Sequence, residues 1–327
     1  MKDTFDREIN YLRVSVTDRC DLRCIYCMKE EMEFLPKSEI LSIEEINDIC
    51  STFIDLGIKK IRITGGEPLI KKGMPTILDY LGKKINNSNL EELTLTTNGT
   101  QLYKYAEVIK KNGVKRINVS LDTLDSKKYL KITRGGNLEK VLEGLNIAKK
   151  IGLKVKINTV ALKNININEL GKMVDWCINK KFNITFIEVM PMDMENTTRL
   201  EQYYPLTKVR SFLEKRYTLE NTNINTGGPA KYVKIKNSNQ KIGFINPLTN
   251  NFCESCNRVR LTCTGRIYSC LGHNKFVDLK VALLKSKKYL KDLILKSIYL
   301  KPKSHEFEID KESTNKNLER TMNVTGG

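Results

Sequence analysis

The sequence lacks any apolar run near the roughly 20 residues that a membrane-spanning helix needs. Histidine is almost absent, with only His273 and His305 in 327 residues, and we assign neither of them a role. The first eight residues carry charges of both signs and lack the apolar core of a signal peptide. We therefore expect a cytoplasmic protein with no membrane partner.

Acidic residues are few beside basic ones: 38 Asp and Glu face 56 Lys and Arg, which gives a net charge of +18. Such an excess favours polyanionic partners such as nucleotides, nucleic acids or anionic membranes. Only 14 of the 56 cations are Arg, so the excess is mostly Lys spread along the chain, as on a solvated surface. Charge alone does not choose the partner.

The nine cysteines are unevenly spread, with two tight groups and two lone residues. Cys50 and Cys177 stand alone in expected amphipathic helices, where they are most simply core thiols. In a reducing compartment, clustered cysteines indicate a metal site rather than a disulfide framework.

From Tyr11 to about Glu188, short β-rich runs alternate with amphipathic segments, which predicts an α/β fold of parallel strands joined by helices. Such repeats form an open sheet or a barrel, and in both the ligands bind at the carboxyl ends of the strands. The candidate motifs all follow predicted strands, so we expect them on one rim. The predicted strands are Tyr11–Thr17, Lys60–Thr64, Glu92–Thr96, Arg116–Ser120, Lys154–Ala161 and Asn183–Glu188.

Beyond about Pro205 the pattern changes, and a smaller second region is expected. A Lys-rich helix is predicted over Asp278–Tyr299, and the polar tail from Pro302 has too few apolar residues to bury much on its own. We predict a partial barrel over residues 1–200 and a C-terminal region over 201–327. Two strand-like runs there are Lys231–Lys236 and Gln240–Asn246.

Cys20, Cys24 and Cys27 offer three thiolates within eight residues, and no histidine or fourth cysteine lies near them in the sequence. A structural zinc site closes with four protein ligands, whereas a four-iron cluster with three cysteines leaves one iron open for a small molecule. S-adenosylmethionine (SAM) can chelate that iron, and an electron from the cluster can then cleave it.

This cysteine loop and the turn Gly65-Gly66-Glu67-Pro68, one βα unit later, resemble the radical SAM superfamily. The resemblance implies that Tyr26 packs near the adenine of SAM and that the Gly-Gly-Glu-Pro turn receives its amino group. It also implies a barrel of the TIM type with six strands, a partial (β/α)6 barrel.

The second group comprises Cys253, Cys256, Cys263 and Cys270, which can supply three ligands or four. Four would make a closed site, and spacing alone slightly favours zinc with four cysteines. Arg258 and the arginine two residues later would face one side of an extended run, matching a phosphate chain beside the metal.

The run from Phe252 to Gly265 and on to Cys270-Leu271 resembles the C-terminal signature of the GTP 3′,8-cyclase family. The resemblance implies a second four-iron cluster on Cys253, Cys256 and Cys270, with Cys263 left out. It places SAM against Tyr26, Gly66, Ser120 and Met190. It places GTP against Arg13, Arg62, Thr96, Lys156, Arg258, Val259 and Arg260, while Lys60 is read as a surface residue.

The implied enzyme is a lyase that converts GTP to (8S)-3′,8-cyclo-7,8-dihydroguanosine 5′-triphosphate, the first step of molybdenum cofactor synthesis. Its implied partners are GTP, an electron donor and the next enzyme of that pathway, with no nucleic acid, and a homodimer is compatible with the family. The resemblance also implies that the tail ending in Gly326-Gly327 reaches into the cavity.

Two alternatives stay open on the residues alone. The first is another radical SAM enzyme with two clusters, such as a peptide-modifying maturase, which would need a peptide cleft in place of the paired arginines. The second is a basic nucleic-acid-binding protein stabilised by zinc, which leaves the loop of three cysteines unexplained.

Overall fold

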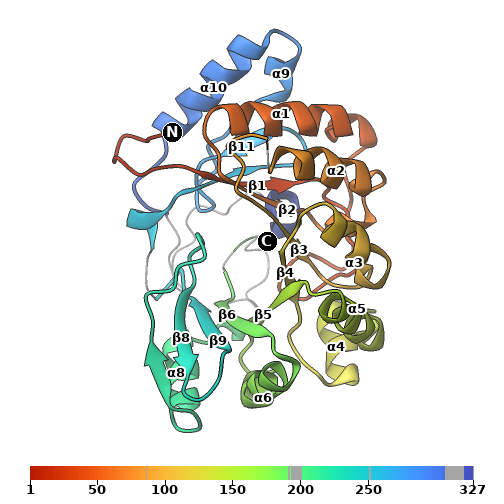
Figure 1. Cartoon of the computed structure of the whole chain (residues 1–327), viewed down its shortest axis with the longest axis vertical. Coiled ribbons are helices and arrows are strands. Elements are labelled where there is room, and N and C mark those ends of the chain that lie inside the picture. The colour runs from red at the N-terminus through yellow and green to blue at the C-terminus, as the bar shows by residue number, and fades with distance from the viewer. Residues whose placement is uncertain (86, 191, 193–200, 250–251, 306–319, 327) are drawn as a thin grey trace.

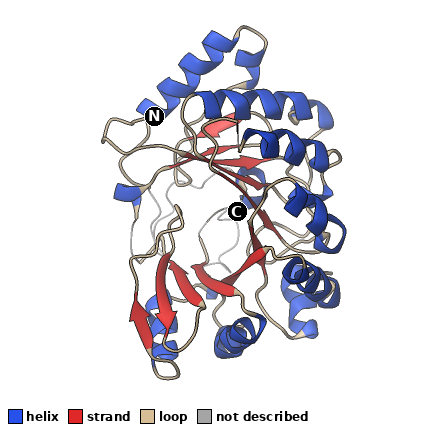
Figure 2. Cartoon of the chain, viewed as in Figure 1, coloured by secondary structure: helices blue, strands red, loops and turns tan. Residues whose placement is uncertain are grey.

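The computed structural model describes residues 1–85, 87–190, 192, 201–249, 252–305 and 320–326. Its centre is a twelve-stranded sheet with the strand order β12-β11-β10-β1-β2-β3-β4-β5-β6-β9-β8-β7. The sheet curves around a concave side, and the helices that join its central strands pack on the convex side (Figure 1). Figure 2 shows the same division, with strands inside and helices outside.

Six consecutive parallel strands form the central part of the sheet, so the predicted partial (β/α)6 barrel is confirmed. Strands β1 and β2 are buried at every position, as parallel strands covered on both faces are. Four of the six strands have the predicted bounds, and β1 and β3 differ only at their last residues. The strands are β1 (Tyr11–Ser15), β2 (Lys60–Thr64), β3 (Glu92–Thr97), β4 (Arg116–Ser120), β5 (Lys154–Ala161) and β6 (Asn183–Glu188).

The connecting helices bury one apolar face against the sheet. The first begins with a capping box: the Ser42 hydroxyl accepts from the Glu45 amide, and the Glu45 carboxylate accepts from the Ser42 amide. Cys50 and Cys177 are buried in this core, as expected. The helices are α1 (Ile43–Asp55), α2 (Met74–Lys84), α3 (Leu102–Lys111), α4 (Ser126–Thr133), α5 (Leu138–Lys150) and α6 (Leu170–Lys180).

The C-terminal region extends both edges of the same sheet. Strand β9 continues the parallel sheet beside β6, and β10 runs parallel to β1 at the opposite edge. The predicted boundary at residue 200 lies outside the described residues, and strands from both sides of it share one sheet. The added elements are α8 (Leu206–Glu214), β7 (Leu219–Asn221), β8 (Lys231–Ile235), β9 (Lys241–Ile245), β10 (Arg258–Leu261), β11 (Arg266–Tyr268) and β12 (Val277–Asp278).

The single helix predicted over Asp278–Tyr299 is wrong, because two helices occupy that range: α9 (Lys280–Leu283) and α10 (Lys287–Tyr299). Ser286 separates them in an extended conformation, and its hydroxyl caps α10 by accepting from the Tyr289 amide. A serine that competes for backbone hydrogen bonds ends one helix and starts the next.

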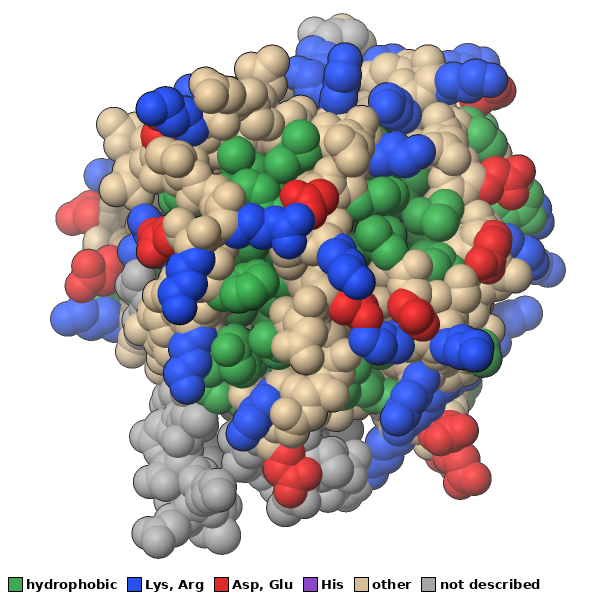
Figure 3. Space-filling model, turned by 90° about the horizontal axis from the view of Figure 1, so that it is seen from below, with side chains coloured by type: hydrophobic (Ala, Val, Ile, Leu, Met, Phe, Trp, Pro, Cys, Tyr) green, Lys and Arg blue, Asp and Glu red, His purple; other side chains and the backbone are tan. Residues whose placement is uncertain are grey.

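None of the described helices is long and apolar enough to cross a membrane. Figure 3 shows one face of the molecule, on which lysine and arginine side chains are dispersed among acidic and apolar ones. On this face, the excess positive charge is therefore spread out, as the dominance of lysine indicates.

Candidate active site

A cavity of about 300 Å³ lies on the concave side of the sheet. Its volume is at the lower end of the range typical of small-molecule sites. The predicted site residues from the strand ends and from the C-terminal region all line it, with the exception of Val259. Chain segments more than 200 residues apart therefore meet in one cavity. The cysteine loop and the glycine turn follow strand ends, as expected for this fold class, whereas the arginines project from within their strands.

The first cysteine loop follows β1, and Cys20, Cys24 and Cys27 all line the cavity. The Leu22 amide donates to Cys20 Sγ at 3.4 Å, and the Cys27 amide donates to the Cys24 carbonyl at 2.9 Å. The neighbouring Asp21 carboxylate accepts from Asn98 Nδ2 at 2.8 Å and from Thr100 Oγ1 at 2.6 Å. The loop is thus tied to the end of β3.

The glycine turn after β2 is shaped by close contact with the cysteine loop. A Cβ atom on Gly66 would lie 2.2 Å from the Arg19 carbonyl oxygen, so only glycine fits there. The buried Glu67 carboxylate accepts from the Leu69 amide, from Thr97 Oγ1 and from the Asn98 amide, at 2.6–2.9 Å. Burial raises the pKa of Glu67 to about 7. Glu67 therefore joins the loops that follow β2 and β3.

Tyr26 is held by an acidic residue from the end of β4. Its hydroxyl donates to Asp122 Oδ2 at 2.7 Å, and Asp122 Oδ1 accepts from the Val160 amide at 2.8 Å. Burial raises the pKa of Asp122 to about 6. The sequence predicted Tyr26 but no partner for it, and this contact fixes the ring beside Cys24 and Cys27.

The second group brings Cys253, Cys256 and Cys270 to the same cavity. Burial would raise the pKa of the Cys256 thiol, but Arg258 and Lys301 lower it to about 6. Arg258 also donates to Cys256 Sγ at 3.6 Å. A thiolate at Cys256 is therefore favoured near neutral pH, which suits a metal ligand.

Cys263 lies apart from the other three cysteines of its group. Its side chain is fully buried, does not line the cavity, and lies near Ser15, Asp18 and Lys71. Its carbonyl accepts from the Leu41 amide at 2.7 Å. Three thiols rather than four face the cavity from this group.

The donor set argues against a single metal ion. Among the described residues, no group of three or more His, Cys, Asp or Glu could hold one. A tetrahedral zinc with Zn–S bonds of about 2.3 Å needs sulfur atoms about 3.8 Å apart. Each group nevertheless presents three thiols to one cavity, and thiolates are the usual ligands of iron–sulfur clusters. Three thiols in the first group fit a cluster that leaves one iron open to a small molecule.

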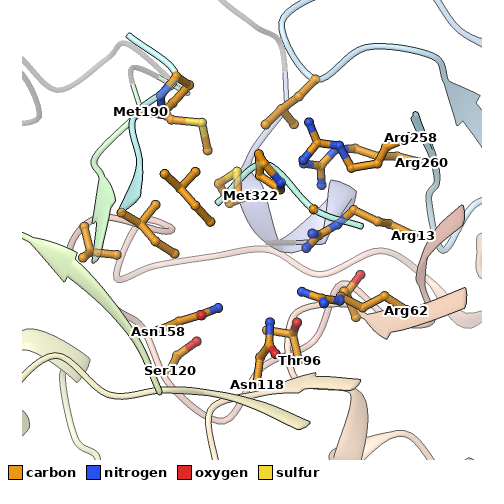
Figure 4. A pocket seen from close by; sticks show the side chains of 18 of the residues that line it. Arg13, Arg62, Thr96, Asn118, Ser120, Asn158, Met190, Arg258, Arg260 and Met322 are labelled. Carbon is orange, nitrogen blue, oxygen red and sulfur yellow. The ribbon is translucent and has the colours of Figure 1, made fainter. Parts of the chain in front are cut away.

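Four arginines form a wall on one side of the cavity, and we refer to Arg13, Arg62, Arg258 and Arg260 as the arginine wall. They come from three adjacent strands, because Arg13 pairs in register with Arg62 on β2 and with Arg260 on β10. Figure 4 shows all four reaching into the cavity, with Thr96, Asn118, Ser120 and Asn158 along another side. Clustered guanidinium groups match a polyphosphate.

Lys156 enters the cavity from β5, which is separated from β10 in the strand order by β1, β2, β3 and β4. Its ammonium donates to Tyr232 Oη at 3.2 Å. Burial and the cations Arg62, Arg116 and Lys60 hold its pKa well below the ordinary value. A cation in such surroundings favours an anionic ligand.

Val259 is the one predicted site residue whose side chain lies elsewhere. It is fully buried in the hydrophobic core between Arg258 and Arg260, on the opposite face of β10. Lys60 also differs from its expected surface position. It is buried, pairs with Glu92 at 2.6 Å and donates to the Thr226 carbonyl at 2.7 Å.

Several cavity residues were not predicted, among them Tyr11, Asn118 and Asn158. Each has a buried side-chain oxygen with no hydrogen-bond partner among the described residues. Each lies two residues along a strand from a predicted site residue, so strand alternation was an available signal.

The described end of the chain also reaches this site. Arg260 donates to the Gly326 carbonyl at 2.5 Å, and a Cβ atom on Gly326 would lie 1.9 Å from Thr64 Oγ1. Asn323 Nδ2 donates to the Asp18 carbonyl at 2.9 Å. Gly327 lies outside the described residues.

Comparison with known proteins adds two family models and many relatives. Residues 14–177 match the Radical SAM superfamily, and residues 182–307 match Molybdenum Cofactor Synthesis C. A GTP 3′,8-cyclase of Bradyrhizobium diazoefficiens is 52% identical over all of this chain and 96% of its own length. That of Mesorhizobium japonicum is 50% identical over all of this chain and 99% of its own.

Solved structures show the same fold at low identity. Streptococcus suis SuiB bound to S-adenosylmethionine has a TM-score of 0.66 at 18% identity, covering 88% of this chain and 65% of that one. The barrel, the match to both family models and the full-length relatives agree. The chain belongs to the GTP 3′,8-cyclase family of radical SAM enzymes.

Proposed function

We propose that this chain converts GTP to (8S)-3′,8-cyclo-7,8-dihydroguanosine 5′-triphosphate, the first step of molybdenum cofactor biosynthesis. The observation that carries the proposal is one cavity lined by two sets of three cysteines and by the arginine wall. The cysteines suit two redox clusters, and the arginines suit a triphosphate. Relatives that match the whole of this chain at 50–52% identity are named GTP 3′,8-cyclase.

The first cluster would be held by Cys20, Cys24 and Cys27, and when bound it supplies the electron that cleaves SAM. SAM would bind beside it, and the hydrogen bond from Tyr26 to Asp122 orients the ring against which the adenine packs. The remaining SAM-binding residues of the proposal are Gly66, Ser120 and Met190.

The triphosphate would bind to the arginine wall and Lys156, with Thr96 beside them. Val259 could take part only through its backbone, since its side chain is turned into the core. Cys253, Cys256 and Cys270 would hold a second four-iron cluster, which would offer an open iron to the guanine.

In this reaction a hydrogen atom leaves C3′ of the ribose with 5′-deoxyadenosine, and C3′ bonds to C8 of guanine. One electron and one proton complete the product. The residues bind and orient both substrates in one enclosed site, which limits side reactions with water. The electron donor, the next enzyme of the pathway, the homodimer and the cytoplasmic location stay predictions.

The test is anaerobic reconstitution with iron and sulfide, followed by reductant, SAM and GTP. Mass spectrometry should detect 5′-deoxyadenosine and a product with the mass of GTP but a different retention time. Cleavage of SAM without that isomer would contradict GTP as the substrate.

A further inference from the structure

Three adjacent strands carry two rows of side chains, and all of these except Lys60 line the cavity. Strand β1 lies between β10 and β2, and its residues 11 and 13 face the cavity because strand residues alternate. One row pairs Tyr11 with Arg258 and with Lys60, and the other pairs Arg13 with Arg260 and with Arg62. Five of these six side chains are cations, and the sixth is a phenol.

The phenol of Tyr11 is an uncompensated polar group in the ligand-free protein. The residue is 1% exposed, and its hydroxyl makes no hydrogen bond of normal geometry among the described residues, where only the neighbouring Arg13 guanidinium interacts with it. Burying a hydroxyl without a partner destabilises a protein, so such groups at a cavity wall commonly mark a ligand contact.

The surroundings of Tyr11 favour an anion at its hydroxyl. Lys60 Nζ and the Arg62 guanidinium lie 5.0 and 5.7 Å from the centre of its ring. Burial would raise the pKa of Tyr11, but Arg62, Arg13, Lys60 and Arg258 hold it below the ordinary value. A phenol of lowered pKa is a stronger hydrogen-bond donor, and the same cations would draw a phosphate towards it.

We infer that Tyr11 is a substrate-binding residue that donates its hydroxyl hydrogen to the phosphate chain of GTP. The inference rests on the proposed function. It gives a role to Tyr11, the one uncharged side chain among the six in these two rows. It differs from the role of Tyr232, whose hydroxyl already contacts Lys156 at 3.2 Å and Thr226 Oγ1 at 3.1 Å.

The test compares Tyr11→Phe with a matched control, Tyr129→Phe. Tyr129 is 2% exposed and its hydroxyl also lacks a partner among the described residues, but it does not line the cavity. Equilibrium dissociation constants for GTP and for guanosine are measured on the anaerobically reconstituted enzyme without reductant. Thermal unfolding is followed on the same samples without nucleotide.

We expect Tyr11→Phe to weaken GTP binding by about 10- to 100-fold, the effect of losing one hydrogen bond to a charged group. Guanosine, which has no phosphate, should bind Tyr11→Phe and the parent enzyme equally. Both variants should melt about 2 °C higher than the parent, because each loses an unsatisfied hydroxyl. Tyr129→Phe should leave the GTP dissociation constant unchanged.

An unchanged affinity for GTP in Tyr11→Phe would overturn the inference, and so would equal losses for GTP and guanosine. A lower melting temperature for Tyr11→Phe alone would mean that the hydroxyl is structural, which also overturns it. Failure of the parent enzyme to form the GTP isomer would count against the proposed function instead, because the binding comparison does not depend on turnover.

Discussion

The two sides of the cavity differ in how their polar groups are satisfied. On the side of the first cysteine loop, Glu67 accepts three hydrogen bonds and Asp21 two, all from the protein itself. On the side of the arginine wall, Tyr11 Oη and Arg62 Nε have no partner among the described residues. The first side is therefore organised before any ligand binds, whereas the second is completed by its ligand.

The two sides also differ in charge. Buried carboxyls with raised pKa values, Glu67 and Asp122, lie on the cysteine side, and cations with lowered pKa values, Lys156 and Arg260, lie opposite. SAM carries a positive sulfonium, and GTP carries a negative triphosphate. A cavity polarised in this way directs two oppositely charged substrates to different walls without a separate pocket for each.

The largest expected effect tests the cysteine side. Cys24→Ala removes one of three thiols on the loop that would hold the first cluster, so SAM cleavage should fall to background. The measurement is 5′-deoxyadenosine formed by the reconstituted, reduced enzyme, together with iron bound per chain, which should fall by roughly half if two clusters are present.

Cys263→Ala is the matched control, because Cys263 is buried outside the cavity. It should keep both the iron content and the SAM cleavage of the parent. Loss of iron in Cys263→Ala, at an unchanged melting temperature, would show that the second site uses four cysteines and would remove its open iron.

The next effect tests the arginine wall. Arg62→Met should raise the KM for GTP by about 10- to 100-fold, since the variant lacks the guanidinium that would donate hydrogen bonds to the charged triphosphate. The ligand-free protein should become more stable, because no described carboxylate pairs with this buried cation. Arg116→Met is the contrast: Arg116 donates to Glu92 at 2.7 Å and does not line the cavity.

Arg116→Met should therefore lower the melting temperature and leave the KM for GTP near that of the parent. If both arginine variants lowered the melting temperature and left the KM unchanged, the wall would be structural and the contrast between the two sides of the cavity would fail.

The barrel was predictable because short β-rich runs alternate with amphipathic segments along the chain, the pattern of parallel strands joined by helices. The site followed from topology, since carboxyl ends of neighbouring strands meet at one rim. Alternation along β10 could have moved Val259 into the core, and alternation along β1 could have added Tyr11. Spacing could not separate Cys263 from its neighbours, because the turn between β10 and β11 decides where that thiol points.

The contacts of Lys60 and of the C-terminal tail were not predictable for a related reason. Lys60 reads as one more surface lysine in the sequence, and only the fold brings the Thr226 carbonyl to it. Likewise, the polar tail has no apolar periodicity, and hydrogen bonds rather than apolar burial place Asn323 and Gly326 at the site.

A third prediction concerns protons. Lys156 has a depressed pKa in the ligand-free protein, among Arg13, Arg62, Lys60 and Arg116. A bound triphosphate should raise that pKa, so between the two values GTP binding takes up a proton and weakens as pH rises, by up to about tenfold per unit. Calorimetric titration in buffers of different ionisation enthalpy measures this uptake. Lys156→Met should abolish it, and an unchanged uptake in that variant would assign the proton elsewhere.

The smallest effect separates two tyrosines, Tyr11, which lines the cavity, and Tyr232, which does not. Tyr232 lies across from Gly243, where a Cβ atom would come within 2.9 Å of its ring, and its hydroxyl bridges Lys156 and Thr226. Tyr232→Phe should therefore cost about 1 kcal/mol of stability, a fall of about 1–2 °C in melting temperature, because it breaks satisfied hydrogen bonds. The expected sign is opposite to that for Tyr11→Phe. Equal shifts for both variants would show that the two hydroxyl groups do not differ in how they are satisfied.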